Sequence, residues 1–221
     1  MVLMARVSCG GLWKRLKSRS TSTWRIKTAV RLNESTLCVL DFESTGVVAG
    51  HPNEPWQIGL VFLREGVVDR ASMWEQFMRI DPTRPFNPHA PGRHAQLREI
   101  LADAPEREML LPQLRERLKG DARVAHNCST EQKMLRMIAP MHRFEPWIDT
   151  LKLAREAWPG LPSYALESLV ETLYLQERIE TLVSDRIAHD ALYDAVAAAV
   201  LLERLCKEGW GNLSLSHLLT T

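Results

Sequence analysis

The segment Thr36–Glu43 constrains the fold more than any other part of the chain. Four consecutive apolar residues, Leu37 to Leu40, are followed by the acids Asp41 and Glu43. An apolar run that ends in this way predicts a buried strand. Because such a strand has to be covered on both sides, we expect a sheet with helices on both faces and with the acids gathered at one end.

Strands and helices alternate along much of the remaining chain. Further strands are expected at Gln57–Arg64, Ser72–Ile80, Arg123–His126 and Trp147–Asp149, with a hairpin at Glu65-Gly66 between the first two. Helices are expected at Arg93–Ala102, Glu106–Lys119, Thr130–Ile138, Leu151–Trp158, Tyr164–Leu173 and His189–Lys207. Three early strands followed by alternating strands and helices predict an α/β fold with a mixed sheet.

Basic residues are concentrated at the start of the chain. The sequence has 28 Lys and Arg and 27 Asp and Glu, but residues 1–33 contain eight basic residues and no acid, which leaves 20 basic and 27 acidic residues from Glu34 onward. We interpret residues 1–33 as a basic extension without persistent structure and residues 34–221 as a folded domain whose acidic surface concentrates cations. The extension fits an arm that binds polyanions, an organellar transit peptide or a start codon that lies further downstream.

Two classes of protein are disfavoured by what the sequence lacks. The longest apolar run, Ala195–Leu202, is far shorter than the roughly 20 residues that span a bilayer, so we expect no membrane segment. The four cysteines form no C-x-x-C pair, which argues against a zinc ribbon or a redox dithiol. Scattered single cysteines suit a reducing compartment, so we expect a cytoplasmic protein unless residues 1–33 direct it to an organelle.

Asp41 and Glu43 are the first candidate metal ligands. Side chains alternate along a strand, so these two acids share a face and Phe42 points to the other. Two carboxylates this close repel each other, and a divalent cation between them offsets the repulsion. Two solvated acids at an exposed strand end would show the same pattern. The small residues Thr45 and Gly46 allow a ligand close to the backbone, but they also fit an ordinary turn.

Further candidate residues begin two of the predicted helices. Glu131 begins the helix after the strand Arg123–His126, where an acid is also favourable to the helix dipole. Asp194 borders the apolar run Ala195–Leu202 and needs a partner, for which a metal ion, a helix cap or an arginine would serve. His189 lies five residues earlier, about 500° around a helix, so we place it at or before the first turn.

Taken together, these segments resemble the motifs of the DEDDh (DnaQ-like) exonucleases, and specifically those of the bacterial exonuclease X group. The matching segments are Val39–Gly46, Val124–Asn127 with Glu131, and His189–Ala195, and the stretches Leu151–Arg155, Trp158–Gly160 and Gly209-Trp210 match as well. The resemblance implies a ribonuclease-H-like fold. It also implies hydrolysis of DNA, with RNA as an alternative, from the 3′ end to nucleoside 5′-monophosphates.

The same resemblance implies a role for each candidate residue. The implied ligands of two Mg²⁺ or Mn²⁺ ions are Asp41, Glu43, Glu131 and Asp194. The implied general base is His189, and the residues expected to bind the 3′ end of single-stranded or duplex DNA are Thr45, Gly46 and Asn127.

The chain departs from the family pattern at two places. Glu131 stands where the family ordinarily has Asp, and His94–Leu97 stands where the family often has His-Gly-Ile-Thr. A catalytically decayed nucleic-acid-binding protein and an RNA-trimming nuclease are therefore kept as alternatives. Asp149, between a strand and a helix, is expected to cap that helix, with a role as a spare metal ligand as the alternative.

Overall fold

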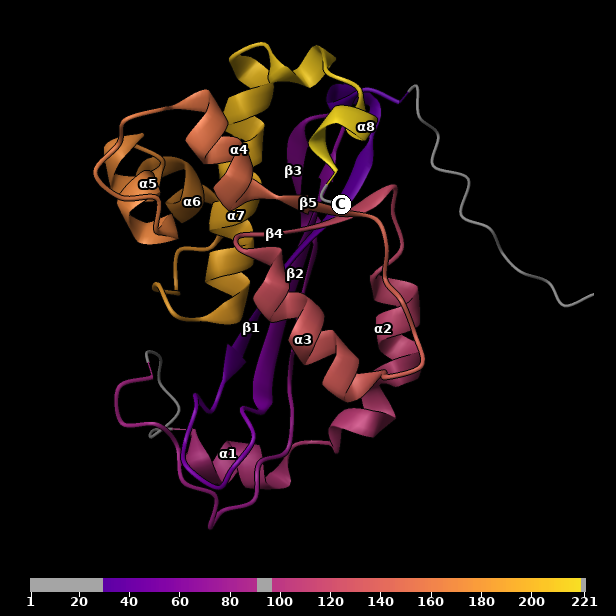
Figure 1. Ribbon diagram of the computed structural model, residues 1–221, viewed down its shortest axis with the longest axis vertical. Coiled ribbons are helices and arrows are strands. Elements are labelled where there is room, and N and C mark those ends of the chain that lie inside the picture. Colours follow the sequence, from indigo (N-terminus) through magenta and orange to yellow (C-terminus); the bar gives the residue numbers. More distant parts are fainter. Residues whose placement is uncertain (1–29, 91–96, 220–221) are drawn as a thin grey trace, which may run out of the picture.

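The computed structural model describes residues 30–90 and 97–219, which contain a five-stranded sheet in the order β3-β2-β1-β4-β5 (Figure 1). The strands are β1 (Thr36–Ser44), β2 (Pro55–Arg64), β3 (Val67–Phe77), β4 (Ala122–Ala125) and β5 (Trp147–Asp149). The pairs β1–β2 and β2–β3 are antiparallel, whereas β1–β4 and β4–β5 are parallel. The sheet is therefore mixed, as predicted, and β1 lies at its centre.

Helices cover both faces of this sheet, as the apolar β1 segment requires. The helices on one face are α4 (Thr150–Ala157), α5 (Leu166–Thr172), α6 (Gln176–Leu182) and α7 (Ala191–Lys207). The helices on the other are α2 (Leu111–Arg117) and α3 (Cys128–Ile138). Figure 1 shows α5 and α6 beside α7, which itself packs on β1 and β2.

Side chains along β1 alternate between the two cores. Leu37 and Val39 pack in the core that contains α7, whereas Leu40 and Phe42 pack in the core that contains α3. The strand period therefore places Asp41 and Glu43 on the α7 face of the sheet.

Several element boundaries differ from those predicted. β3 begins at Val67 rather than at Ser72, because Glu65 and Gly66 both have positive φ (51° and 77°) and form a tight two-residue turn after which pairing resumes at once. α7 begins at Ala191 rather than at His189. Two short helices, α6 and α8 (Leu215–Leu218), were not predicted, because segments of four to seven residues show too little periodicity.

The remaining helices are α1 (Arg98–Asp103) and the 3₁₀ segments η1 (Leu32–Glu34), η2 (Arg107–Leu110) and η3 (Trp210–Asn212). α1 thus begins at Arg98, five residues after the start of the predicted helix Arg93–Ala102, and Leu97 before it is not helical. Residues 93–96 lie outside the described residues, and so does most of the segment His94–Leu97 that departs from the family pattern.

The folded region begins before the predicted boundary at Glu34. Leu32 is completely buried in the α7 core, and its N–H donates to the carbonyl oxygen of Leu213 at 2.9 Å. Arg31 forms a bridge with Ser214. Residues 30–33 therefore belong to the domain, while the first 29 residues of the predicted extension lie outside the described residues.

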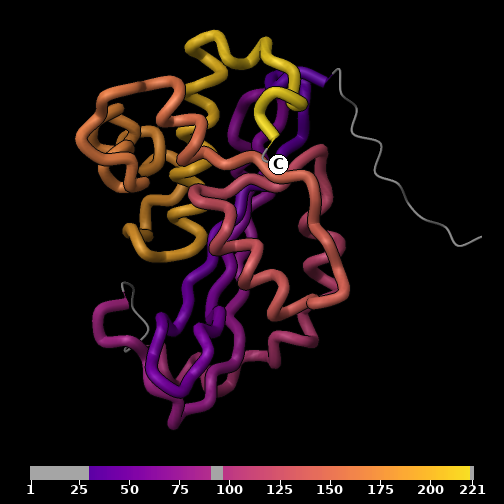
Figure 2. The backbone as a smooth tube through the Cα atoms, in the orientation of Figure 1, coloured from indigo at the N-terminus to yellow at the C-terminus, as the bar shows by residue number. Residues whose placement is uncertain are grey.

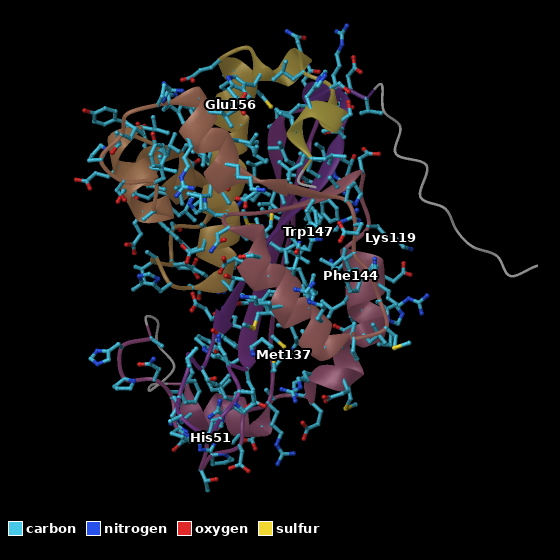
Figure 3. All side chains as sticks on the ribbon, in the orientation of Figure 1. His51, Lys119, Met137, Phe144, Trp147 and Glu156 are labelled. Atoms are coloured by element: carbon cyan, nitrogen blue, oxygen red, sulfur yellow. The ribbon has the colours of Figure 1, made fainter. Side chains whose placement is uncertain are left out.

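The β1–β2 loop lies at the end of the molecule away from the C-terminus (Figure 2). Figure 3 shows His51 of this loop at that end. The region is packed around a small apolar cluster of Trp56, Ile80, Phe86 and Leu101. Within the described ranges, none of the helices combines the length and the hydropathy that crossing a bilayer requires.

Candidate active site

The predicted metal ligands and the predicted base come from three elements that meet at one end of the sheet. Asp41 and Glu43 lie in the second half of β1, and Glu131 lies in the first turn of α3. Asp194 lies in the first turn of α7, and His189 directly precedes the cap of that helix.

Distances and electrostatics both indicate that these side chains converge. Ligand atoms of Glu43, His189 and Asp194 all lie within 4.8 Å of one another. Burial raises the pKa of Asp41 well above its usual value, and the neighbouring charges of Glu131, Asp194 and Glu43 raise it further. The structure thus brings together the four predicted metal ligands and the predicted base.

The carboxylates of this cluster strongly disfavour being ionised together. Burial, with the charge of Asp194 as the next cause, raises the pKa of Glu43 to about 8. Burial likewise raises the pKa of Glu131 to about 8 and that of Asp194 to about 7. Like charges withdrawn from water need an opposite charge nearby, and a divalent cation supplies it.

Glu131 carries the clearest sign of a missing partner. Its residue is only 3% exposed, and its Oε2 atom has no hydrogen-bond partner among the described residues. A buried carboxylate oxygen without a donor is costly, and a bound cation is one partner that would satisfy it. All four acids offer hard oxygen ligands, the type that Mg²⁺ and Mn²⁺ prefer, so the residues present fit such ions.

The turn before α7 holds His189 next to Asp194. Asp190 caps the helix by accepting hydrogen bonds from the N–H groups of Leu192 at 3.1 Å and Tyr193 at 3.3 Å. His189 has a φ of 63°, which is uncommon for a residue other than glycine, and its N–H donates to Oδ2 of Asp194 at 3.1 Å. The prediction that His189 lies at or before the first turn is therefore confirmed.

A buried polar network that sequence reasoning missed holds this turn to the sheet. Gln57 of β2 donates to Oδ2 of Asp190 at 3.3 Å and accepts from the N–H of Ala191 at 3.3 Å. Arg186 bridges Glu75 of β3 and Asp190. Asp190 had a recognisable signal, since an Asp directly before an apolar helix is a capping pattern. Gln57, Glu75 and Arg186 had none, because their partners depend on strand register.

Asn127 and Asp149 lie together beside Glu131. Asn127 is exposed, has a φ of 72°, and its N–H donates to Oδ1 of Asp149 at 3.0 Å. The same oxygen accepts from the N–H of Leu151 at 3.0 Å, so the prediction that Asp149 caps the following helix is confirmed. The exposed Asn127 side chain lies at the start of α3, where its Oδ1 accepts a hydrogen bond from the hydroxyl of Ser129 at 3.0 Å.

The loop after β1 is packed differently from what the sequence suggested. Thr45 is completely buried, and its hydroxyl accepts hydrogen bonds from the N–H of Glu54 at 3.0 Å and from Arg84 at 3.3 Å. A Cβ on Gly46, whose φ is 71°, would lie 2.6 Å from the Cβ of Asn87. Thr45 therefore shapes the loop and offers no exposed atom to a substrate, while the small size of Gly46 is required by the segment that covers it.

The fold is that of a ribonuclease-H-like α/β protein, and its candidate site is a cluster of acids whose oxygens fit divalent cations. The chain belongs to the RNase_T exonuclease family, whose model matches residues 38–202. This membership and the fold confirm the predicted relation to the DEDDh exonucleases.

Individual relatives agree with this assignment. The chain is 33% identical to Exodeoxyribonuclease 10 of Escherichia coli (strain K12) over 132 residues, 59% of this chain and 54% of that protein. It thus spans about half the length of that relative. The structure of exonuclease X in complex with 5′ overhanging duplex DNA matches with a TM-score of 0.59 and 28% identity, covering 78% of this chain and 92% of the other. The nuclease domain of 3′hExo bound to rAMP shares the fold, with a TM-score of 0.62 at 14% identity, over 84% of this chain and 96% of the other.

Proposed function

We propose that this protein is a divalent-metal-dependent exonuclease that hydrolyses DNA from the 3′ end and releases nucleoside 5′-monophosphates. The observation that carries the proposal is the buried, unpartnered Oε2 of Glu131 beside the Glu43, His189 and Asp194 cluster. Acids whose pKa values are raised by burial, and further by one another's charges, are typical of a functional site, which favours an enzyme over a catalytically decayed protein. DNA is proposed as substrate because the relatives above 25% identity have names that refer to DNA.

In this proposal two Mg²⁺ or Mn²⁺ ions are held by Asp41, Glu43, Glu131 and Asp194. Bound cations of this kind supply positive charge that offsets the negative charge developing on the phosphodiester oxygens. Glu131 has one methylene more than Asp and reaches the site from the first turn of α3.

His189 is the proposed general base. It takes a proton from the water that attacks the phosphorus of the last phosphodiester. The bond from that phosphorus to the 3′ oxygen of the preceding nucleotide breaks, and the leaving oxygen takes a proton from solvent to become the new 3′-hydroxyl. An imidazole suits this role because histidine side chains in general exchange a proton near neutral pH. Asp194 holds the backbone of His189 through the 3.1 Å hydrogen bond, so one residue contributes both a ligand and the position of the base.

The 3′ end is proposed to bind between the β1–β2 loop and the start of α3. Asn127 is exposed there and can donate to or accept from the terminal nucleotide. Gly46 would offer backbone, and Thr45 would act by holding that backbone in place through Glu54 and Arg84.

The experiment that tests the function uses DNA and RNA oligonucleotides, single- and double-stranded, labelled at the 5′ end or at the 3′ end. A 3′→5′ exonuclease turns the 5′ label into a descending ladder and releases the 3′ label at once as a mononucleotide. Degradation should require Mg²⁺ or Mn²⁺ and stop with EDTA. A ladder from the 3′-labelled strand would contradict the polarity, and degradation of RNA only would favour the RNA-trimming alternative.

A further inference from the structure

Glu167, in the first turn of α5, contacts the ring of His189. The Nε2 atom of His189 lies 2.9 Å from Oε1 of Glu167. α5 itself is fixed by Leu169 and Val170, which are buried in the core shared with α7. The backbone of His189 is fixed from the other side by its hydrogen bond to Asp194. Both partners of the contact are therefore attached to well-packed elements.

The neutral imidazole ring has one N–H and one nitrogen with a lone pair. A carboxylate can only accept a hydrogen bond, so the ring nitrogen facing Glu167 must carry the hydrogen. The lone pair that takes a proton is then on Nδ1. Hydrogen bonds of this kind commonly decide the tautomer and the orientation of functional histidines.

We propose that Glu167 is the positioning residue of His189: it accepts a hydrogen bond from Nε2–H and thereby selects both the tautomer and the orientation in which the ring acts as base. This inference rests on the proposed exonuclease function and assigns to the same site a residue outside its sequence motifs. Glu167 has no contact with substrate in this scheme and acts only through His189.

An incidental surface ion pair is the alternative explanation of the contact. The side chains of His189 and Glu167 are 41% and 57% exposed, and exposed pairs contribute little to stability. This contact, however, joins two elements that are fixed independently. Leu169 and Val170 pack α5 into the core, and Asp194 holds the backbone N–H of His189, so the 2.9 Å contact fixes the ring of the proposed base at its far end.

The test compares Glu167→Ala and Glu167→Gln with Glu171→Gln, a control that removes one charge from the exposed side of the same helix. The full chain is used, and its unfolding temperature is measured for every variant. Because the contact is exposed, the three variants should unfold at the same temperature as the wild type.

Two readouts separate positioning from a purely structural role, and the first is steady-state kinetics. Glu167→Ala should lower kcat by about 10- to 100-fold with little change in KM, the range typical for residues that hydrogen-bond the far side of a metal-site histidine. Glu167→Gln should recover most of the loss, because its amide oxygen can accept the same hydrogen bond. Glu171→Gln should match the wild type.

The second readout is the tautomer of His189, followed by ¹⁵N NMR of its ring at a pH where the ring is neutral, with His189→Ala used to assign the signal. The wild type and Glu167→Gln should be in the Nε2–H form, and Glu167→Ala should show a mixture. An unchanged tautomer in Glu167→Ala, or a wild-type kcat, would overturn the proposal. If the wild-type protein has no nuclease activity, the proposed function fails, whereas the NMR measurement still decides whether Glu167 holds the ring.

Discussion

Asp41 pairs directly with Gly59 across the β1–β2 ladder. A Cβ on Gly59 would lie 2.2 Å from the backbone nitrogen of Leu192 and 2.4 Å from the carbonyl of Ala191. The first turn of α7 therefore rests on the one strand position next to Asp41 that has no side chain. This close approach places Asp194 and His189 beside the β1 acids.

Gly59→Ala should therefore damage the site as well as the fold. The new methyl group meets backbone atoms that cannot rotate away, and overpacking of this kind costs about 1–3 kcal/mol or more. Urea unfolding should show a loss of this size together with loss of most nuclease activity. Gly160→Ala is the control, since its Cβ would meet nothing within 4 Å and the positive φ of 85° should cost only about 1 kcal/mol. If Gly59→Ala were as active as the wild type, the close approach of α7 to Gly59 would not be what places Asp194 and His189 beside the β1 acids.

Stability without metal should fall as pH rises. Glu43, Glu131 and Asp194 have folded-state pKa values of about 8, about 8 and about 7, above their unfolded values. The folded protein therefore holds more protons than the unfolded chain between about pH 4 and pH 8, and raising the pH through this window removes stability.

The check is a series of unfolding temperatures in EDTA across that window, repeated with Mn²⁺. The decline should be clear in EDTA, and the stabilisation by Mn²⁺ should be greatest at the alkaline end, where the ligands are ionised. Glu43→Gln should raise the unfolding temperature in EDTA at pH 8 and reduce the gain from Mn²⁺. A flat profile that Mn²⁺ does not alter would argue against a carboxylate metal centre.

Glu131 should be a functional ligand despite its unusual length. Its carboxylate reaches roughly 1.5 Å further than that of Asp, about one carbon–carbon bond. Glu131→Gln removes the charge at constant size and should reduce nuclease activity strongly. Glu131→Asp should cause a smaller loss of activity, because its carboxylate keeps the charge but does not reach as far toward the metal. An inactive wild type that Glu131→Asp restores would support the decayed-enzyme alternative instead.

His189→Ala should separate proton transfer from metal binding. Losing a general base typically costs about 10²–10⁴-fold in rate. The four acids remain in this variant, so Mn²⁺ binding measured by calorimetry should be retained while kcat falls by that factor. Wild-type turnover over a range of pH would exclude His189 as the base.

The structure brings together the residues that the sequence motifs singled out, and each of them lies at a recognisable point of an element. The D-x-E pair ends an apolar strand, Glu131 begins a helix, and Asp194 borders the longest apolar run, while their roles as ligands came from the resemblance to a family. The residues that position the site could not be predicted from the sequence. Gly59 is informative only once it is known to lie opposite Asp41, and Glu167 only once α5 is known to pack against α7.

Thr45 is a residue whose predicted role in substrate binding the structure corrects. The resemblance to the family implied that Thr45 binds the 3′ end, but the segment around Arg84 and Asn87 folds over Thr45 and buries it. Burial of a loop by a distant segment leaves no local pattern, because it depends on which parts of the chain meet in space.

The central claim, that the carboxylate cluster is a metal-dependent nuclease site, is tested most directly by the wild type and Asp41→Asn side by side. Asn keeps the size of Asp and removes the charge that burial and four neighbouring acids oppose. Both proteins are incubated with 5′-labelled single-stranded DNA in Mn²⁺, with unfolding curves to confirm that both are folded. We predict a descending ladder from the wild type that EDTA abolishes and no measurable degradation by Asp41→Asn. Degradation by Asp41→Asn at the wild-type rate, or a wild-type rate that is unaffected by EDTA, would contradict the claim.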